Sequence, residues 1–284
     1  MTYQKPKLAI SFSGGRTSAV MTKLLLDQYR DDYSEIEVVF CNTGQEHEAT
    51  LEFVKDCDEQ WGFNTVWLEG VTNHRRGVGT THRIVNFEHA DRAGYPFETM
   101  VQKYGIPGPG YLHCTRELKE VPFRSYLKGI GWKDHKIAIG IRADEIDRTS
   151  PGGRFIYPMA DWGWTKEMVN AEVRRWPFDL KIPNDAHGNC VWCWKKSFRK
   201  LYTLAKSNPE YFDFPMMLED KYKNHGAGND PRILFRKRTT TREILKQSQT
   251  IGFTPYQDDP PQEQLSWLDV GGGCGESCEI GADN

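Results

Sequence analysis

The segment Ser11–Ser18 places glycines, hydroxyls and a cation directly before an expected helix, a combination that suits the binding of an anion. The apolar run Leu8–Ile10 is typical of a buried strand, and the chain breaks at Gly14 and Gly15 before an amphipathic helix. Glycines let the backbone approach a ligand, and the unpaired amides of a first helical turn point toward it. The side chains that could add donors are Ser11, Ser13, Arg16, Thr17 and Ser18. The segment therefore predicts a phosphate-binding loop, although a helix N-cap after a tight turn has the same pattern.

A second polar group, Asn42, Thr43 and Gly44, follows the expected strand Ile36–Phe40. The span from the first strand to Gly44 has the length of one βαβ unit, which places both strand ends at one edge of a parallel sheet. Open α/β sheets bind their ligands at this edge. The three residues are therefore candidate nucleoside contacts, and a simple turn into the next helix is the alternative.

A third group follows the expected strand Lys136–Gly140, whose last residue, Gly140, is included in the predicted nucleotide site. Arg142 is placed to meet a phosphate, and Asp144 or Glu145 could orient it or help to hold Mg²⁺. A surface ion pair among these side chains is the alternative.

Seven cysteines are spread along the chain, and Cys190 and Cys193 form a Cys-x-x-Cys pair. An odd number of cysteines without a secretory signal argues against a disulfide framework and favours metal or redox chemistry. A Cys-x-x-Cys pair lets two thiolates reach one metal from a tight turn. An iron–sulfur cluster, a zinc knuckle that includes Cys274 and Cys278, and free thiols all remain open. The cysteines predicted to lie in the core are Cys41 and Cys57.

These residues need a scaffold of alternating strands and helices, and the apolar periodicity predicts one. The expected strands are Lys7–Ser11, Ile36–Phe40, Thr65–Leu68, Lys136–Gly140 and Phe155–Pro158. The expected helices are Ser18–Tyr29, Glu48–Trp61, Pro122–Lys128, Thr165–Arg175, one ending near Lys206, and Asn208–Tyr222. Residues 70–114 lack this periodicity and are predicted to be a lid or substrate loop with short helical pieces, one near Pro96–Tyr104. The prediction is an α/β fold with a mostly parallel, doubly wound sheet in residues 1–206 and a helical and irregular extension in residues 207–284.

The composition limits the partners that the chain can have. With 284 residues, 38% of them hydrophobic, it can bury a core, but its formal net charge of −2 creates no global field to attract a polyanion. Nucleic-acid binding would need a local patch, and a solvated charged face is the equal alternative for the basic run near the C-terminus. The cations of this run include Arg232, Arg236, Lys237, Arg238 and Arg242. No apolar run approaches about 18 residues and no apolar signal region is present, which predicts no membrane contact and a cytoplasmic protein.

The segment Ser11–Ser18 resembles the PP-loop of ATP pyrophosphatases, whose usual form is Ser-Gly-Gly-x-Asp-Ser, with Thr17 here in place of the aspartate. Further motifs in order are similar to the phosphoadenosine phosphosulfate (PAPS) reductase branch of this superfamily. They are Asn42–Gly44, Cys114–Glu117, Gly140–Glu145, Tyr157–Pro158 and Gly188–Cys193. The resemblance covers roughly residues 5–205. It implies a mostly parallel, five-stranded sheet of the adenine nucleotide α-hydrolase-like class, with an adenine nucleotide at its carboxyl edge.

This resemblance implies cleavage of ATP between its α and β phosphates, with ATP and Mg²⁺ as cofactors. True PAPS reductases share a C-terminal Glu-Cys-Gly-Leu-His segment, which this chain lacks. The pattern is closer to relatives that activate an oxygen with ATP and replace it with sulfur, among them tRNA thiolation enzymes and DNA phosphorothioation ATP pyrophosphatases. Several such enzymes hold a 4Fe–4S cluster with three cysteines, and Cys114, Cys190 and Cys193 fit that arrangement. The catalytic residues implied are Arg16, Cys114, Arg116, Arg142 and Asp144.

The expected function is that of an ATP pyrophosphatase that adenylates an acceptor oxygen for iron–sulfur-assisted sulfur insertion. Nucleic acid is the expected acceptor, and a cysteine desulfurase or another sulfur donor is the implied partner. A DNA backbone, a tRNA base and a small molecule all remain open as acceptors. The alternatives are a PAPS or adenylyl-sulfate reductase and a non-catalytic nucleotide or nucleic-acid binding module. The oligomeric state is open as well, a homodimer included.

Overall fold

The structure is a computed structural model, and it describes residues 5–149, 152–225 and 231–258. Within them, six strands form one sheet in the order β4–β3–β2–β1–β5–β6. The strands are β1 (Leu8–Ser11), β2 (Ile36–Asn42), β3 (Val66–Val71), β4 (Thr81–Val85), β5 (Lys136–Ile139) and β6 (Phe155–Ile156). Neighbouring strands are parallel except for β3 and β4. The predicted mostly parallel α/β sheet is thus confirmed, with six strands where five were expected.

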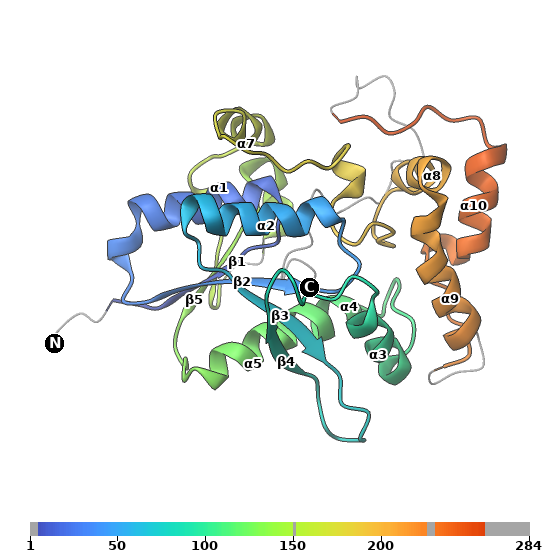
Figure 1. Cartoon of the computed structure of the whole chain (residues 1–284), viewed down its shortest axis with the longest axis horizontal. Helices are drawn as coiled ribbons and strands as arrows, with labels where there is room; N and C mark the ends of the chain where they lie inside the picture. The colour runs from blue at the N-terminus through green and yellow to red at the C-terminus, as the bar shows by residue number, and fades with distance from the viewer. Residues whose placement is uncertain (1–4, 150–151, 226–230, 259–284) are drawn as a thin grey trace.

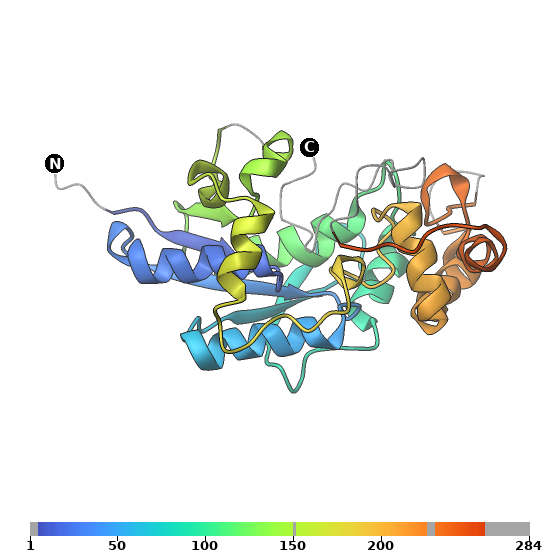
Figure 2. The same ribbon diagram turned by 90° about the horizontal axis from the view of Figure 1, so that it is seen from above.

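Helices cover both faces of the sheet: α1 and α2 lie above it in Figure 1, and α5 lies below it. The helices are α1 (Arg16–Gln28), α2 (Glu48–Trp61), α3 (Tyr95–Tyr104), α4 (His113–Thr115), α5 (Val121–Gly129), α6 (Pro158–Asp161), α7 (Lys166–Val173), α8 (Phe198–Ser207), α9 (Asp213–Tyr222) and α10 (Thr241–Thr250). Figures 1 and 2 both show α8, α9 and α10 gathered at the end of the molecule that lies away from the N-terminus. Of the helices in the described ranges, none has the length and apolar character needed to cross a lipid bilayer.

The central strand β1 fixes where the candidate residues meet. Ser11, its last residue, lies opposite Val39 of β2 and Ile139 of β5. The chain passes from β1 to β2 and β3 on one side and later returns to β5 on the other, so the strand order reverses beside β1. Ligands of open α/β sheets bind in the crevice at such a reversal. The fold therefore places the candidate site near the carboxyl ends of β1 and β5.

Three buried apolar clusters hold the layers together. Successive side chains of a strand point to opposite faces. Leu8 and Ile10 therefore belong to the cluster between the sheet and helices α1 and α2, whereas Ala9 belongs to the cluster between the sheet and α5. The third cluster joins α3, the Cys-x-x-Cys segment and α8–α10 around Trp192 and Phe212. This cluster contains residues from both sides of position 206, where the sequence predicted a boundary between a nucleotide-binding domain and a C-terminal extension. That boundary stays a prediction.

Residues 70–114 contain more regular structure than the predicted lid or loop. The strand β4 pairs with β3 at the sheet edge, and α3 lies where a short helix was predicted. β4 was missed because it does not show a buried apolar alternation: Ile84, its fourth residue, is 62% exposed. The helix α10 was also missed, although Thr240 and Glu243 form a capping box that marks its start.

Candidate active site

The predicted phosphate loop has the backbone conformation that an anion site needs. Gly14 has a φ of 78°, and a Cβ atom there would lie 2.7 Å from Cγ2 of Thr50 on α2. A residue with a side chain would therefore be strained in its backbone conformation and crowded by Thr50. Gly15 is the N-cap of α1, and among the described residues no side chain caps this helix end. Backbone amides of a first helical turn are the groups that a phosphate site uses.

The hydroxyls of the loop hold its shape. Ser11, Thr17 and Ser18 are buried, and Ser13 is half-buried. The hydroxyl oxygens of Ser13 and Ser18 are 2.8 Å apart, and the Ser18 hydroxyl donates to the Gly15 carbonyl at 3.0 Å. These bonds stabilise the turn between β1 and α1, and contacts of the same hydroxyls with a nucleotide stay a prediction.

The end of β5 lies directly against this loop. A Cβ atom on Gly140 would lie 3.2 Å from Cα of Ser18, so the close approach depends on glycine. Arg142 is 8% exposed, and its guanidinium donates to Thr17 Oγ1 at 3.2 Å and to Asp144 at 3.0 Å. Glu145 lies 3.3 Å from the same guanidinium. The predicted cluster is therefore present, and its carboxylates orient Arg142 toward the phosphate loop; the bond to a phosphate stays a prediction.

Arg16 does not direct its side chain as the sequence predicted. Its Nε and Nη2 atoms pair with the Asp179 carboxylate at 2.7 and 3.1 Å, and Nη2 also donates to the Leu180 carbonyl at 2.9 Å. Arg16 and Asp179 line a cavity of about 220 Å³ together with Lys166 and other residues of α7. The ion pair ties α1 to the segment after α7, so the geometry gives the guanidinium a structural role. The phosphate contact through the backbone amide of Arg16, the first residue of α1, stays a prediction.

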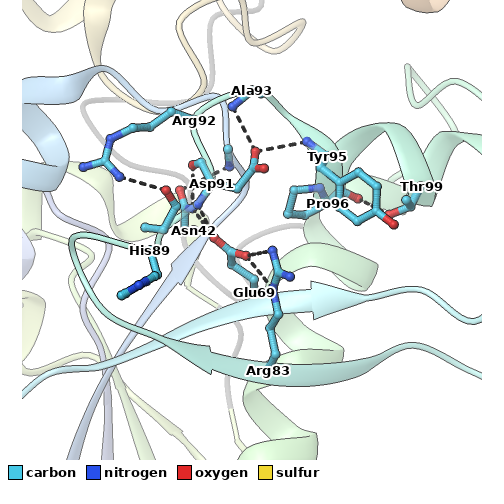
Figure 3. A network of polar contacts seen from close by, with 12 residues as sticks. Asn42, Glu69, Arg83, His89, Asp91, Arg92, Ala93, Tyr95, Pro96 and Thr99 are labelled. Carbon is cyan, nitrogen blue, oxygen red and sulfur yellow. Dashed lines mark hydrogen bonds and ion pairs between the residues drawn. The ribbon is translucent and has the colours of Figure 1, made fainter.

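Asn42 belongs to a buried network at the end of β2, which Figure 3 shows from close by. Its amide donates to Glu69 at 2.7 Å and to the Asp91 carbonyl at 2.9 Å. Its own carbonyl accepts from the Gly44 amide at 3.1 Å. Glu69 in turn accepts two bonds from Arg83, at 2.8 and 2.6 Å. Both donors of the Asn42 side chain are used inside the protein, so Asn42 positions the loop and does not make the predicted nucleoside contact through its amide.

Thr43 connects the end of β2 to the Cys-x-x-Cys segment. Its hydroxyl donates to Glu46 at 2.8 Å and lies 3.3 Å from Sγ of Cys190. Because a hydroxyl has one proton, the thiol must be the donor in the contact with Thr43. The Val191 amide also donates to the Gln45 carbonyl at 3.0 Å, which fixes the segment in the same place. The Cys190 thiol is thereby held at the sheet edge that carries the phosphate loop.

The three predicted metal ligands come from two segments. The Cys193 amide donates to the Cys190 carbonyl at 2.9 Å, so this pair forms one tight turn. Cys114 lies on α4, packs against the same apolar cluster as Cys190 and precedes a π-helical turn, Arg116–Glu120. π-helical turns are frequent at functional sites. Among the described residues, no three His, Cys, Asp or Glu side chains are already arranged to hold a metal ion. The cysteines that lie outside the described residues are Cys274 and Cys278.

Burial keeps several thiols protonated. It raises the pKa of Cys190 well above its ordinary value, with the Glu46 carboxylate and the Cys193 thiol acting in the same direction. Burial also raises the pKa of Cys41 to about 12 and that of Cys57 further, and both residues lie in the core as predicted. A bound metal would have the opposite effect on Cys190, because coordination deprotonates a thiol.

The cations of the predicted nucleic-acid patch contact different parts of the fold. Arg232 lies over the Tyr111 ring at 4.4 Å, and Arg242 pairs with Asp220 at 2.7 Å. Arg236 donates to a backbone carbonyl just after the Cys-x-x-Cys pair. The exposed members are Lys237, Arg238 and Arg242. Arg232 is therefore the member of the run that lies near the segment of Cys114.

Sequence reasoning missed three carboxylates that position the site: Glu46, Glu69 and Asp179. Glu46 lies two residues after the Gly44 turn, so its proximity to the predicted nucleotide loop was a usable signal. Asp179 lies 163 positions from its partner Arg16 in α1, and no local sequence pattern predicts such a pair. Glu69 is fully buried in a strand that reads as apolar, and a buried carboxylate of this kind is itself a signal of a polar network.

Comparison with known proteins agrees with this geometry. Residues 7–152 match the family model described as the phosphoadenosine phosphosulfate reductase domain. The chain belongs to this family. The PAPS reductase domain match includes the phosphate loop, the β2 end, Cys114 and Arg142, and it ends before the Cys-x-x-Cys pair. The chain is therefore a nucleotide-binding PP-loop protein, and its family favours an enzyme.

Relatives of this PAPS reductase family member extend further along the chain. The uncharacterised nin region protein ORF290 of Escherichia phage lambda is 33% identical over 281 residues, which cover 95% of this chain and 94% of that protein. Two uncharacterised proteins of Methanocaldococcus jannaschii are 30% and 32% identical over 146 and 118 residues, 25% and 22% of their lengths. The PAPS reductase of Candida auris, in a phosphate complex, is 15% identical with a TM-score of 0.36 over 61% of this chain and 73% of that chain. That similarity is too low for a comparison residue by residue.

Proposed function

We propose that the chain is an ATP pyrophosphatase that adenylates an acceptor oxygen and prepares it for replacement by sulfur. The observation that carries this proposal is the 3.3 Å contact between Thr43 and Cys190. It brings a Cys-x-x-Cys pair to the end of the strand next to the phosphate loop, although the two residues are 147 positions apart. ATP hydrolysis alone would not require thiols at this edge, whereas sulfur transfer to an adenylated oxygen would.

In the first step, the acceptor oxygen attacks the α-phosphorus of ATP, and the bond to the bridging oxygen of pyrophosphate breaks. Negative charge develops on that bridging oxygen, and the amides of Gly14, Gly15 and Arg16 would stabilise it as pyrophosphate departs. Arg142 would bind a phosphate oxygen from the side of β5, and Asp144 would help to hold Mg²⁺. An acceptor that is already anionic, such as a nucleic-acid phosphate, needs no strong protein base.

In the second step, a sulfur nucleophile attacks the activated centre and AMP leaves with the original acceptor oxygen. The sulfur would come from the persulfide of a cysteine desulfurase or of another donor, whose terminal sulfur attacks the centre. A thiol reductant then cleaves the S–S bond, supplies the two electrons and leaves in a disulfide. We propose that Cys114, Cys190 and Cys193 hold a 4Fe–4S cluster at this edge, with zinc as the alternative metal. Such a cluster, when bound, keeps sulfur anionic at neutral pH. The shared apolar cluster and the tight Cys190–Cys193 turn fit this ligand set.

The direct test is pyrophosphate release from ATP in the presence of candidate acceptors: single-stranded DNA, duplex DNA and tRNA. Wild-type protein should release pyrophosphate and AMP, and Ser13→Ala and Arg142→Gln should slow release without loss of fold. Arg175→Gln, two residues after the end of α7, serves as a matched control, because the Arg175 side chain is 78% exposed.

Two results would redirect the assignment. Sulfite formation from PAPS with a thiol reductant, without ATP cleavage, would identify a reductase instead. Binding of ATP without pyrophosphate release, with every acceptor and sulfur donor, would identify a binding module. Transfer of labelled sulfur to nucleic acid that requires both ATP and Cys190 would support the full proposal.

A further inference from the structure

A cavity of about 320 Å³ lies beside the segment of Cys114, outside the phosphate loop. Aromatic, aliphatic, hydroxyl, cationic and acidic side chains line it. They are Tyr111, Leu112, His113, Thr115, Arg116 and Glu120. The volume is at the lower end of the range for small-molecule pockets, which suits a group of the size of one nucleotide.

Three rings and two guanidinium groups form a row, of which Tyr111, His113 and Arg116 line the cavity. The rings of Tyr111, His113 and Tyr104 follow one another, with centroids 6.0 and 5.7 Å apart. Arg232 lies over the Tyr111 ring at 4.4 Å, and Arg116 lies over the Tyr104 ring at 5.6 Å. A row of three rings with a cation at each end is the combination that binds single-stranded nucleic acids through base stacking and phosphate contacts.

Both cations are held in place by the fold. The Arg232 guanidinium donates to the Tyr104 carbonyl at 2.9 Å, and it occupies the space beside Gly105. A Cβ atom on Gly105 would lie 2.5 Å from Nη1 of Arg232, so this arginine can take its position only because residue 105 is a glycine. Arg116 donates from Nε to Glu117 at 2.7 Å, while half of its side chain stays exposed. A ligand would thus meet preformed groups and lose little of its binding energy in ordering them.

His113 contributes the middle ring of this row, between Tyr111 and Tyr104. Of the three rings, Tyr111 offers the most surface, because it is 48% exposed.

We propose that this cavity binds one nucleotide of a single-stranded nucleic acid, with the base against Tyr111 and His113 and the phosphate at Arg116. The inference deepens the proposed function, on which it rests, because it names the place of the acceptor strand next to Cys114. A base inside a duplex already stacks on its neighbours and exposes only its edges, so a row of rings favours an unpaired strand. The overall charge of −2 also means that affinity must come from such a local arrangement.

The test measures binding of a fluorescein-labelled oligonucleotide of about 12 nucleotides by fluorescence anisotropy at several salt concentrations, in the absence of ATP. Tyr111→Ala should weaken binding about 5- to 150-fold, and Tyr111→Phe should leave it nearly unchanged, because one stacked base is lost only in the first variant. Arg116→Gln should weaken binding and lower the slope of log affinity against log salt by about one, whereas Tyr111→Ala should leave the slope unaltered. Tyr95→Ala removes a ring that is 62% exposed at the other end of α3, and it should bind as wild type does.

Ultraviolet crosslinking of a thiouridine-containing strand adds a readout of position, with crosslinks expected at Tyr111 or His113. Binding that is equal in wild type, Tyr111→Ala and Arg116→Gln would overturn the inference. So would a mononucleotide or inorganic phosphate that competes as well as the strand, because the cavity would then take a free nucleotide. Pyrophosphate assays separate the two hypotheses: Tyr111-dependent strand binding without any ATP cleavage would support the binding site and refute the proposed reaction. Pyrophosphate release, together with strand binding that is unchanged in Tyr111→Ala and Arg116→Gln, would support the proposed reaction and refute the binding site.

Discussion

Arg142→Gln offers the sharpest test of the phosphate site. The variant loses the bonds to Thr17 at 3.2 Å and to Asp144 at 3.0 Å. The carboxylates left behind are not stranded, because Glu145 keeps its 2.6 Å pair with Arg148 and the Asp144 side chain is 40% exposed. The free energy of unfolding should therefore fall by only about 1–2 kcal/mol. Removal of a donor to developing negative charge should instead cost about 2.7–4 kcal/mol in the transition state, which is about 100- to 1,000-fold in kcat.

The assay is pyrophosphate release at saturating ATP, with thermal melting of the same preparations. We expect the rate to fall about 100-fold or more while Tm falls by about 2–6 °C. Arg148→Gln removes the other arginine of this cluster, and it should show a similar loss of Tm with a far smaller loss of rate. A rate in Arg142→Gln within about threefold of wild type would refute a phosphate contact. A similar loss of rate in both variants would make Arg142 a structural residue.

Three further predictions follow from contacts around this site. Gly14→Ala should lower the free energy of unfolding by about 2–4 kcal/mol in chemical denaturation, because of the positive φ and the 2.7 Å contact with Thr50. The double variant with Thr50→Ser lacks the Thr50 methyl group, so it should recover only the loss that comes from this contact. Burial lowers the pKa of His47, so the folded protein disfavours the protonated imidazole. The stability that neutral His47 contributes above the unfolded-state pKa should therefore be lost as the pH falls from about 7.5 to about 5. Protonation also removes the acceptor with which His47 caps α2. His47→Asn keeps a capping side chain and should flatten this loss of Tm, and equal pH profiles would contradict the reasoning. Cys114→Ala and Cys190→Ala should each remove a broad absorption near ~400 nm and the bound iron from protein purified without oxygen, and zinc without iron would contradict the proposed cluster.

The fold was predictable to the extent that its signals are local. The strands β1, β2 and β5 read from apolar runs, and parallel pairing then places the residues after them at one edge. β4 could not be found in this way, because an exposed Ile84 at a sheet edge carries no alternation. The helix α10 did have a signal, since Thr240 and Glu243 have the capping-box spacing, but they lie in a basic run that suits a binding surface and a solvated charged face equally.

The candidate site likewise combines contacts that a local pattern predicts with contacts that only the fold creates. The cluster of Arg142, Asp144 and Glu145 was predictable because its members are neighbours in the sequence. The partner of Arg16 was not, because Asp179 reaches it only through packing of the segment after α7 on α1. Side-chain bonds to residues far along the chain decide whether a predicted donor is available, and a single sequence does not encode them in any short pattern.

The contact between Thr43 and Cys190 also determines the order in which the parts of the site can assemble during translation. The two residues are 147 positions apart, so a ribosome that adds about 5–20 residues per second finishes Cys190 about 7–30 s after Thr43. During this interval the phosphate loop and the β2 end can already be synthesised and paired. The nucleotide half of the site can thus mature first and serve as the template on which the thiol segment docks. A nascent chain stalled before Cys190 should accordingly bind ATP while it lacks any thiol-dependent chemistry.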